Sequence, residues 1–468
     1  MLTGRVISFE MRPVLLLEIN EVPWRLVDLA VRSRRCPSLT AFFDRAATYT
    51  SISADEGELS PWITWPSLHR GLNNTEHGIK NLGQDISTFR GTPLWEEYRK
   101  RGLSVGVCGS MQSWPATDPG RGGFYIPDTF AHDPCTIPKD IEPLQAMNLD
   151  LVNKNGLVSR QLDLLSRKTL RALPALARRV SLKTGARIAV QLTAERFDKT
   201  LRARRPIFQT LLFWDVFRSL YENEDAPPLA TFFTNHVAGV MHRFWNHVFP
   251  EDFSEPNSGE HLATMHFALS VLDEMLAQAL RWLDERPDLI IAFASSMGQT
   301  AVHREKVGYV ASVTDLPRFM RSFGFAEGKY KPLLAMVPQV AVEIASPNAR
   351  GKLKNDLLAA RTPSQQSMFE VDEVASSLSI TILTPKGGDA TAGGFLDSTG
   401  QLIPFSQAGV TLNDFADGTG YHVPEGVLAI VGRGINPTAK RQSIPLSAVK
   451  QLLMSIAEID TLHAANAV

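Results

Sequence analysis

Three short runs of this chain are apolar on both sides of the backbone, and each ends in polar residues. They are "VLLLEINE" at 14–21, "LATFFTNH" at 229–236 and "LIIAFASS" at 289–296. A strand without polar alternation has to be covered on both faces, as in the parallel sheets of α/β proteins. Segments with helical spacing separate the runs, so we expect an α/β fold in which helices pack on both sides of a mostly parallel sheet.

Two segments interrupt this α/β pattern. We predict a core formed by residues 1–150, 223–304 and 416–468, with insertions at 151–222 and 305–415. The first insertion is helical and rich in arginine, so we interpret it as a basic cap. Its charged face is either simply solvated or attracts an anionic substrate to the cleft. The second has Pro, Gly and Ser clusters between short strand candidates, so we expect a mixed insertion with some β structure.

The composition is that of an ordinary globular protein, with 44% hydrophobic and 21% charged residues. A net charge of −1 argues against a nucleic acid polymer as partner. The three cysteines, Cys36, Cys108 and Cys135, form no CxxC pair, so we expect neither a disulfide framework nor a thiolate zinc site. Because the sequence lacks a signal-like N-terminus and any run of about 18 apolar residues, we expect a cytoplasmic protein without a membrane span.

Clusters of polar residues follow or adjoin the predicted core strands. The carboxyl ends of parallel strands meet at one edge of a sheet, and the sites of such folds lie there. The clusters therefore indicate one site, whose candidate residues are Glu18, Asn20, Glu21, Thr64, His236, His242, Ser295, Ser296, Gln299 and His422.

The order of these clusters resembles the alkaline phosphatase superfamily, especially its type I phosphodiesterase/nucleotide pyrophosphatase branch. The similar stretches are "WITWPSLHRGLNNTEHGI", "FFTNHVAGVMHRFW", "IIAFASSMGQT" and "GYHVPEGVLAIVGRGI". The two insertions have no counterpart in that pattern. The resemblance implies a three-layer α/β/α sandwich and places Thr64 at the position of the nucleophile.

The chain departs from the family pattern at the metal ligands. That family holds two cations with Asp and His side chains, but Asn20 and Ala238 stand here at two of the Asp positions. Ser and Met at 296–297 replace an Asp-His pair, whereas His242 and His422 remain. The resemblance therefore implies a reduced metal site. It holds either one divalent cation, Zn or Mn, bound by His242 and His422, or none.

Two glutamates at the end of the first strand are candidates for the missing negative charge. By strand alternation, Glu18 and Asn20 point to one side and Glu21 to the other. We expect one glutamate in the pocket, where it would act as a catalytic acid or base or as a ligand, and the other in a structural role. The sequence leaves open which is which.

The remaining candidates each have two interpretations. Thr64 is either a nucleophile or a cap of the helix that begins near Ser60. His242 and His422 could have a functional role, as metal ligands or acid–base groups. In the other interpretation they are buried histidines that only bond to the backbone. We expect the substrate to contact Asn20, Ser295, Ser296, Gln299 and His236.

Together these features predict a hydrolase or transferase that acts on a phosphoester, a phosphodiester or a related anionic ester. Thr64 would be its nucleophile, and its metal site would be single or absent. The substrate would be a small molecule or a glycoconjugate. The alternative is a pseudoenzyme on the same scaffold that binds a nucleotide or a glycoconjugate without turning it over, and the loss of the Asp ligands favours this alternative.

Overall fold

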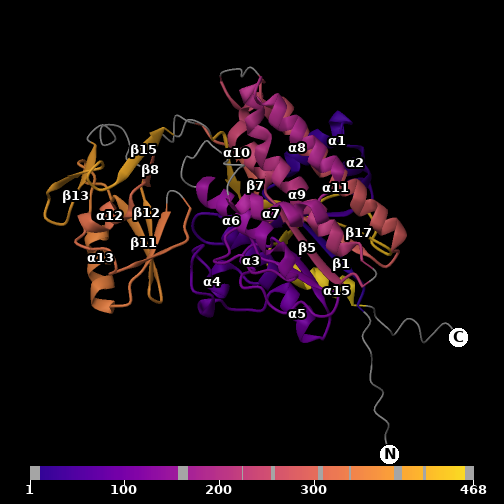
Figure 1. Cartoon of the computed structure of the whole chain (residues 1–468), viewed down its shortest axis with the longest axis horizontal. Coiled ribbons are helices and arrows are strands. Elements are labelled where there is room, and N and C mark those ends of the chain that lie inside the picture. Colours follow the sequence, from indigo (N-terminus) through magenta and orange to yellow (C-terminus); the bar gives the residue numbers. More distant parts are fainter. Residues whose placement is uncertain are drawn as a thin grey trace, which may run out of the picture.

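A large α/β body carries a smaller lobe at one side (Figure 1). This computed structural model describes residues 11–155, 167–223, 225–254, 259–303, 309–336, 339–383, 393–414 and 418–458.

The body is built on an eight-stranded sheet. In spatial order its strands are β18 (Gln442–Pro445), β2 (Ala47–Ile52), β17 (Glu425–Gly432), β6 (Ile290–Ala294), β1 (Val14–Ile19), β5 (Leu229–Thr234), β3 (Val105–Cys108) and β4 (Phe124–Ile126). Strand β1 pairs in parallel with both β5 and β6, and β17 runs antiparallel to both of its neighbours. The predicted α/β class with a mostly parallel sheet is therefore confirmed, and the first apolar run lies inside the sheet.

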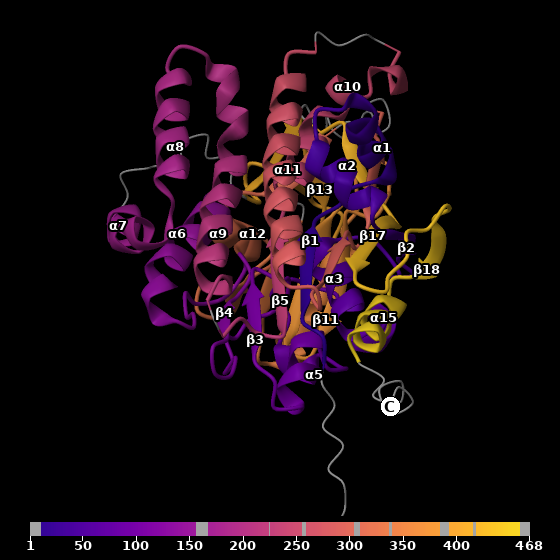
Figure 2. The same cartoon turned by 90° about the vertical axis from the view of Figure 1, so that its right-hand side faces the viewer.

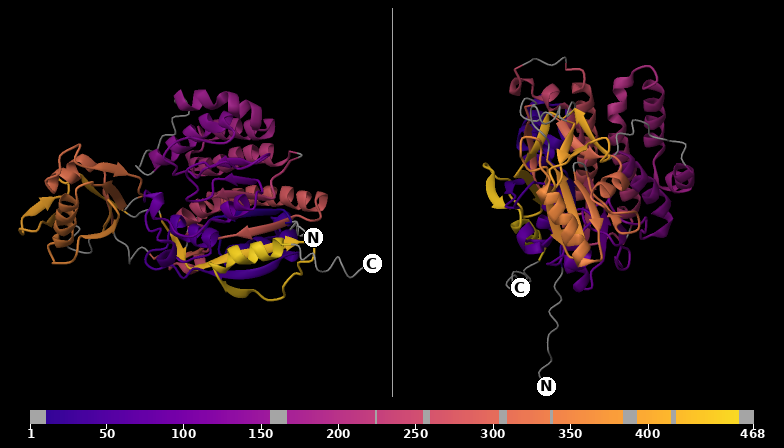
Figure 3. Two further views of the ribbon diagram at one scale, coloured as in Figure 1. Left: turned by 90° about the horizontal axis from the view of Figure 1, so that it is seen from below. Right: turned by 90° about the vertical axis from the view of Figure 1, so that its left-hand side faces the viewer.

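Helices cover both faces of the sheet (Figures 2 and 3). One face packs against α1 (Trp24–Ser33), α2 (Pro37–Asp44), α9 (Arg205–Tyr221), α10 (His236–Val248) and α11 (Leu262–Glu285). The other packs against α3 (Pro61–Arg70), α5 (Leu94–Lys100) and α15 (Ala448–Ala457). Strand β1 contributes Leu15, Leu17 and Ile19 to the first core and Val14 and Leu16 to the second. Each such side chain gains about 1.5–3 kcal/mol from burial, which explains why neither face of β1 carries alternating polar residues.

The arginine-rich segment is helical where the structure describes it. It contains α6 (Glu142–Asn155), α7 (Arg167–Arg179), α8 (Leu182–Ala194) and the 3-10 helix η3 (Lys199–Arg204), and it leads into α9. Residues 156–166 of the predicted insertion lie outside the described residues. Helix α9 belongs to the layer on the sheet, whereas α8 stands farther out (Figure 2). None of the described helices combines the length and the apolarity that a bilayer crossing needs.

The lobe has a hydrophobic core of its own. In its described residues it contains a four-stranded antiparallel sheet, two further antiparallel strand pairs and two helices, and it projects from the body (Figure 3). Its elements are β8 (Tyr309–Val313), α12 (Leu316–Ser322), β9 (Lys331–Leu333), β10 (Gln339–Glu343), α13 (Pro347–Ala359), β11 (Phe369–Val374), β12 (Ser377–Ile382), β13 (Gly394–Leu396), β14 (Leu402–Pro404) and β15 (Val410–Asp414).

A short antiparallel pair lies where the central strands end. Strand β7 (Gly298–Ala301) follows β6, and β16 (Gly420–Val423) precedes β17. Their pairing sets Gln299 directly opposite His422, so both side chains share one face of the pair. The short elements α4 (Asn74–His77), η1 (Ile86–Thr88), η2 (Lys139–Ile141) and η4 (Pro250–Asp252) lie in the connections.

Candidate active site

Three side chains from separate elements converge at the end of β1. Glu21 follows β1, His242 lies on α10 and His422 lies on β16. The Oε2 atom of Glu21 is 2.7 Å from Nε2 of His242 and 3.3 Å from Nε2 of His422. One ligand-type atom from each residue lies within 4.8 Å of the other two. We refer to these three residues as the Glu–His–His cluster.

The backbone at Glu21 departs from the strand that precedes it. Strand β1 ends at Ile19, and Glu21 adopts a left-handed conformation with φ of 56°. This conformation is uncommon for a residue other than glycine and marks a position that its surroundings hold in place. Strand alternation therefore does not set the direction of the Glu21 side chain.

Backbone carbonyls orient both imidazoles of the cluster. The Nδ1 atom of His242 is 2.9 Å from the carbonyl oxygen of Gly420, and Nδ1 of His422 is 2.7 Å from that of Leu59. A carbonyl only accepts, so each Nδ1 carries a proton and donates it. In a neutral ring, Nε2 then presents a lone pair toward the Glu21 carboxylate. Such an arrangement is favourable only when a proton or a cation lies between the two groups.

The electrostatics of the cluster favour a bound positive charge. Burial alone would raise the pKa of Glu21, but the charge and hydrogen bonds of His242 and His422 outweigh burial and hold this pKa well below its usual range. Burial alone would lower the pKa of His242, yet the nearby Glu21 carboxylate raises it above its ordinary value. Glu21 therefore stays ionised, and the histidines compete for its negative charge.

Two amides also hold the Glu21 carboxylate. Gln299 donates from Nε2 to Oε2 of Glu21 at 2.5 Å and to the Ala238 carbonyl at 3.2 Å. Asn20 donates from Nδ2 to Oε1 of Glu21 at 2.8 Å. The indole of Trp65, which can only donate, gives its hydrogen to Oδ1 of Asn20 at 2.8 Å and so fixes that amide. Oε1 of Gln299 is buried without a hydrogen-bond partner among the described residues, so this oxygen is available as a further ligand atom for a cation.

The donor set of the cluster suits one divalent cation. Two imidazole nitrogens and one carboxylate oxygen are the protein ligands of a common type of catalytic zinc site, whose fourth position stays open. Within the described chain, no other group of three His, Cys, Asp or Glu ligand atoms has this proximity. The nearby Asn20 amide is already bonded to Trp65, Glu21 and Asn235.

Thr64 lies on α3 and is fully buried. Its Oγ1 atom is 2.7 Å from Oγ of Ser296 and 3.3 Å from the carbonyl oxygen of Ser60. Helix α3 begins at Pro61 after Ser60, so Thr64 is its fourth residue and not its N-cap. The structure thus brings together Thr64 and Ser296, two of the predicted site residues.

Glu18 lies in a different environment from Glu21. It is fully buried on the side of β1 that faces α3, where Oε1 is 2.7 Å from Nε2 of His69. His69 stacks on Trp65 and meets Trp95 edge-on. Oε2 of Glu18 and Nδ1 of His69 have no hydrogen-bond partner in the described chain. Of the two glutamates, Glu21 is therefore the one that meets the two predicted histidine ligands.

Two predicted substrate-binding residues, Ser295 and His236, make hydrogen bonds within the protein. Ser295 donates to the Ile19 carbonyl at 2.5 Å and accepts from the Val22 amide at 3.3 Å. The ring of His236 bonds to the Thr234 hydroxyl at 2.8 Å and the Ala268 carbonyl at 3.2 Å, and burial lowers its pKa to about 4. Polar groups at buried strand ends have to find such partners, so polarity alone did not separate these residues from the cluster.

Three residues of the site were missed in the sequence. Asn235 accepts from Asn20 at 2.7 Å, Trp65 fixes the same amide, and His69 pairs with Glu18. Asn235 belongs to the polar end of the "LATFFTNH" run, which is the signal that could have identified it. In the sequence, a tryptophan next to Thr64 looks like a core residue, because only the fold shows which acceptor its indole N–H bonds to.

No family model and no curated protein sequence matches the chain. Solved structures with a similar fold include the murine and human ectonucleotide pyrophosphatase/phosphodiesterase 5, both at 11% identity over 95% of each chain, with TM-scores of 0.45 and 0.44. Another is phosphonoacetate hydrolase from Sinorhizobium meliloti 1021 in complex with phosphonoformate, at 13% identity over 98% of each chain and a TM-score of 0.44. A function for this site therefore has to be inferred from the contacts in this chain.

Proposed function

We propose that the chain is a hydrolase or transferase that acts on a small phosphoester, phosphodiester or related anionic ester, with one divalent cation (Zn or Mn) at the Glu–His–His cluster. The observation that carries this proposal is the convergence of a buried carboxylate on two imidazoles whose Nδ1 atoms are both fixed by backbone carbonyls. Such an arrangement presents one oxygen and two nitrogen lone pairs to the same point, as a cation requires.

The residues of the cluster have separate tasks in this proposal. Glu21, His242 and His422 would hold the cation, which when bound polarises an ester oxygen and stabilises an oxyanion. Gln299 and Asn20 keep both carboxylate oxygens of Glu21 in position. Because Glu21 is 2% exposed, its charge acts on the site with little screening by water.

Thr64 is the proposed nucleophile. Its Oγ1 would lose its proton and form a bond to phosphorus or sulfur while the bond to the leaving oxygen breaks, so that the leaving group departs with a proton and a covalent threonine ester remains. Ser296 fixes the Thr64 hydroxyl through their 2.7 Å hydrogen bond. Water would then release the group in a hydrolase, and another hydroxyl would take it in a transferase.

Metal content and turnover test this proposal together. Purified protein should contain about one Zn or Mn per chain by mass spectrometry of the metal. It should hydrolyse at least one of p-nitrophenyl phosphate, bis-p-nitrophenyl phosphate and p-nitrophenyl sulfate, and chelation should remove this activity. Stoichiometric metal without turnover would point to a binding protein with the same site. If neither metal nor turnover is found, after reconstitution with Zn and Mn has been tried, the proposal is wrong.

A further inference from the structure

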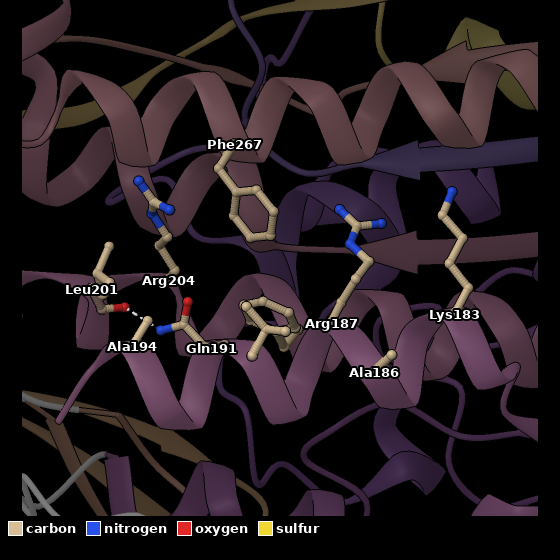
Figure 4. A pocket seen from close by; sticks show the side chains of 10 residues that line it. Lys183, Ala186, Arg187, Gln191, Ala194, Leu201, Arg204 and Phe267 are labelled. Carbon is tan, nitrogen blue, oxygen red and sulfur yellow. Dashed lines mark hydrogen bonds between the residues drawn. The ribbon is translucent and has the colours of Figure 1, made fainter. Parts of the chain in front are cut away.

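A groove of about 460 Å³ lies between helices α8 and α11, beside η3 (Figure 4). Most of its surface is apolar: Phe208 and Phe267 line it together with Ala186, Val190, Ala194 and Leu201. No residue of the Glu–His–His cluster lines this groove. Its size falls within the range of pockets that enclose most of a small organic ligand.

The polar groups of the groove are mainly cations. Lys183 and Arg187 lie along α8, and both reach Glu274, at 3.1 and 3.0 Å. At the other end, Arg204 has no carboxylate within ion-pair distance among the described residues, and its Nε atom is buried without a hydrogen-bond partner. Its guanidinium lies 5.4 Å from the ring centre of Phe267. Three cations line the groove against Glu274 and the more distant Asp198, whose charge acts on Arg204, so the groove keeps a net positive charge next to an aromatic surface.

The outward face of α8 is apolar as well. Leu182 and Val190 on α8 are 94% and 68% exposed, and Phe197 just after α8 is 87% exposed. The inward side of α8 instead buries the polar residues Thr184 and Gln191. Ile188 on α8 packs against the first core, so α8 has apolar residues on its inner side and on its exposed side, which departs from the usual pattern of a surface helix. Val190 belongs to this face and also lines the groove, so the two surfaces are continuous.

We propose that this groove binds an amphipathic anion, with its apolar chain or ring against Phe208 and Phe267 and its anionic head at Arg204. The apolar lining provides a gain from burial, which a purely inorganic anion cannot use. The guanidinium offers donors that match a carboxylate or a phosphate head. A neutral amphiphile would leave Arg204 without a partner.

The charge of the surrounding segment supports an anionic ligand over a second copy of the chain. Residues 171–205 contain ten Lys and Arg residues but only two Asp and Glu residues, whereas the whole chain has a net charge of −1. Two copies that met through this face would place like charges against each other, which disfavours self-association. An anion relieves the same excess charge. The ligand could reach the groove as a free amphiphile in solution or as a lipid in a bilayer, and the experiment distinguishes these sources.

Calorimetric titration of the full chain with sodium decanoate and decyl phosphate, below their micellar concentrations, tests the proposal. Binding should be saturable, with decanol and inorganic phosphate at least about tenfold weaker. Arg204→Met should weaken decanoate by at least about tenfold, while the matched variant Arg202→Met, two residues away and exposed outside the groove, should not. Ala194→Trp, which fills the groove, should abolish binding without loss of the folded state by circular dichroism. Glu21→Gln should leave decanoate affinity unchanged, which separates this site from the cluster.

A flotation assay identifies the source of the ligand. Arg204-dependent binding to vesicles of phosphatidylcholine with phosphatidylglycerol, but not to phosphatidylcholine alone, supports a lipid taken from a bilayer. Saturable decanoate binding without vesicle binding supports a free amphiphile. Equal affinity of wild type and Arg204→Met for decanoate, or equal affinity for decanoate and inorganic phosphate, would overturn the proposal.

Discussion

Replacing each of the two buried glutamates near the end of β1 by glutamine gives a matched test of the metal site. Glu21 and Glu18 are three residues apart, and both are almost fully buried and meet a histidine at 2.7 Å. Only Glu21 meets two histidines. Both substitutions remove one buried carboxylate. A difference in Zn affinity between the two variants therefore reflects where the carboxylate lies, and not the loss of a charge as such.

We expect Glu21→Gln to lower the affinity for Zn by more than about 100-fold. The loss of a residue that merely orients a ligand typically costs 10–100-fold, and Glu21 would be the anionic ligand itself. Glu18→Gln should leave the affinity unchanged. It should instead lower the free energy of unfolding by about 1–3 kcal/mol, because its bond to His69 is weakened inside the core.

The assay is competition with a chromophoric chelator, followed by isothermal titration at pH 7.5. Circular dichroism and urea unfolding of both variants confirm that each is folded. Equal loss of affinity in the two variants would refute the reasoning, since it would show that the metal responds to general damage at this sheet edge. Undiminished affinity in Glu21→Gln would remove Glu21 from the ligand set.

Two further predictions concern the nucleophile and the pH dependence. Thr64→Ala should reduce kcat by at least about 100-fold. Thr64→Ser keeps the hydroxyl, so it should retain a measurable rate and a covalent intermediate in rapid-quench experiments. Full activity in Thr64→Ala would exclude the threonine ester. In metal-free protein, the lowered pKa of Glu21 contributes stability that is lost as pH falls below about 4.5, and the raised pKa of His242 contributes stability that is lost as pH rises above about 6.5. Urea unfolding should therefore show a larger difference between wild type and Glu21→Gln at pH 5.5 than at pH 8.5, and a constant difference would contradict the pairing. Zn should reverse this trend, because it binds the deprotonated histidines.

The sheet could be predicted because its central strands have no polar face. The runs that contain β1, β5 and β6 have to be buried on both sides, and this requirement gives a parallel sheet with two helical layers. The antiparallel direction of β17 was not predictable in the same way. Its apolar run fits either direction, and the turn of the chain from β16 into β17 settles which one is formed.

Local rules did not decide between the two glutamates. Alternation along β1 sends Glu18 to the side of α3 with Val14 and Leu16, but it does not extend to Glu21, which follows the strand in a left-handed conformation. It does not show that His242 and His422 meet on the side of Glu21. That meeting depends on α10 and on the pairing of β7 with β16, which bring His242 and His422 to Glu21, a residue more than 200 positions before either of them in sequence.

The cluster also indicates how a carboxylate can change its place in a site. The resembling family carries an Asp where this chain has Ala238, one helical turn before His242 on α10, so that the two side chains share one face of the helix. Here Glu21 is the carboxylate that meets His242, and Gln299 bonds both to Glu21 and to the backbone of Ala238. The Gln299 amide thus links the two positions, and we propose that a carboxylate at position 238 can replace the one at Glu21.

Returning the carboxylate to α10 tests this exchange. Glu21→Gly should lose Zn affinity while tolerating the left-handed backbone, and the second change Ala238→Asp should recover at least about tenfold of it. The new Asp would lie in the first turn of α10, where the helix dipole favours an anion. Ala238→Asn in the same background is the uncharged control. If the Asp variant is folded and binds Zn no better than the Asn control, then a carboxylate at position 238 does not substitute for Glu21 as a ligand.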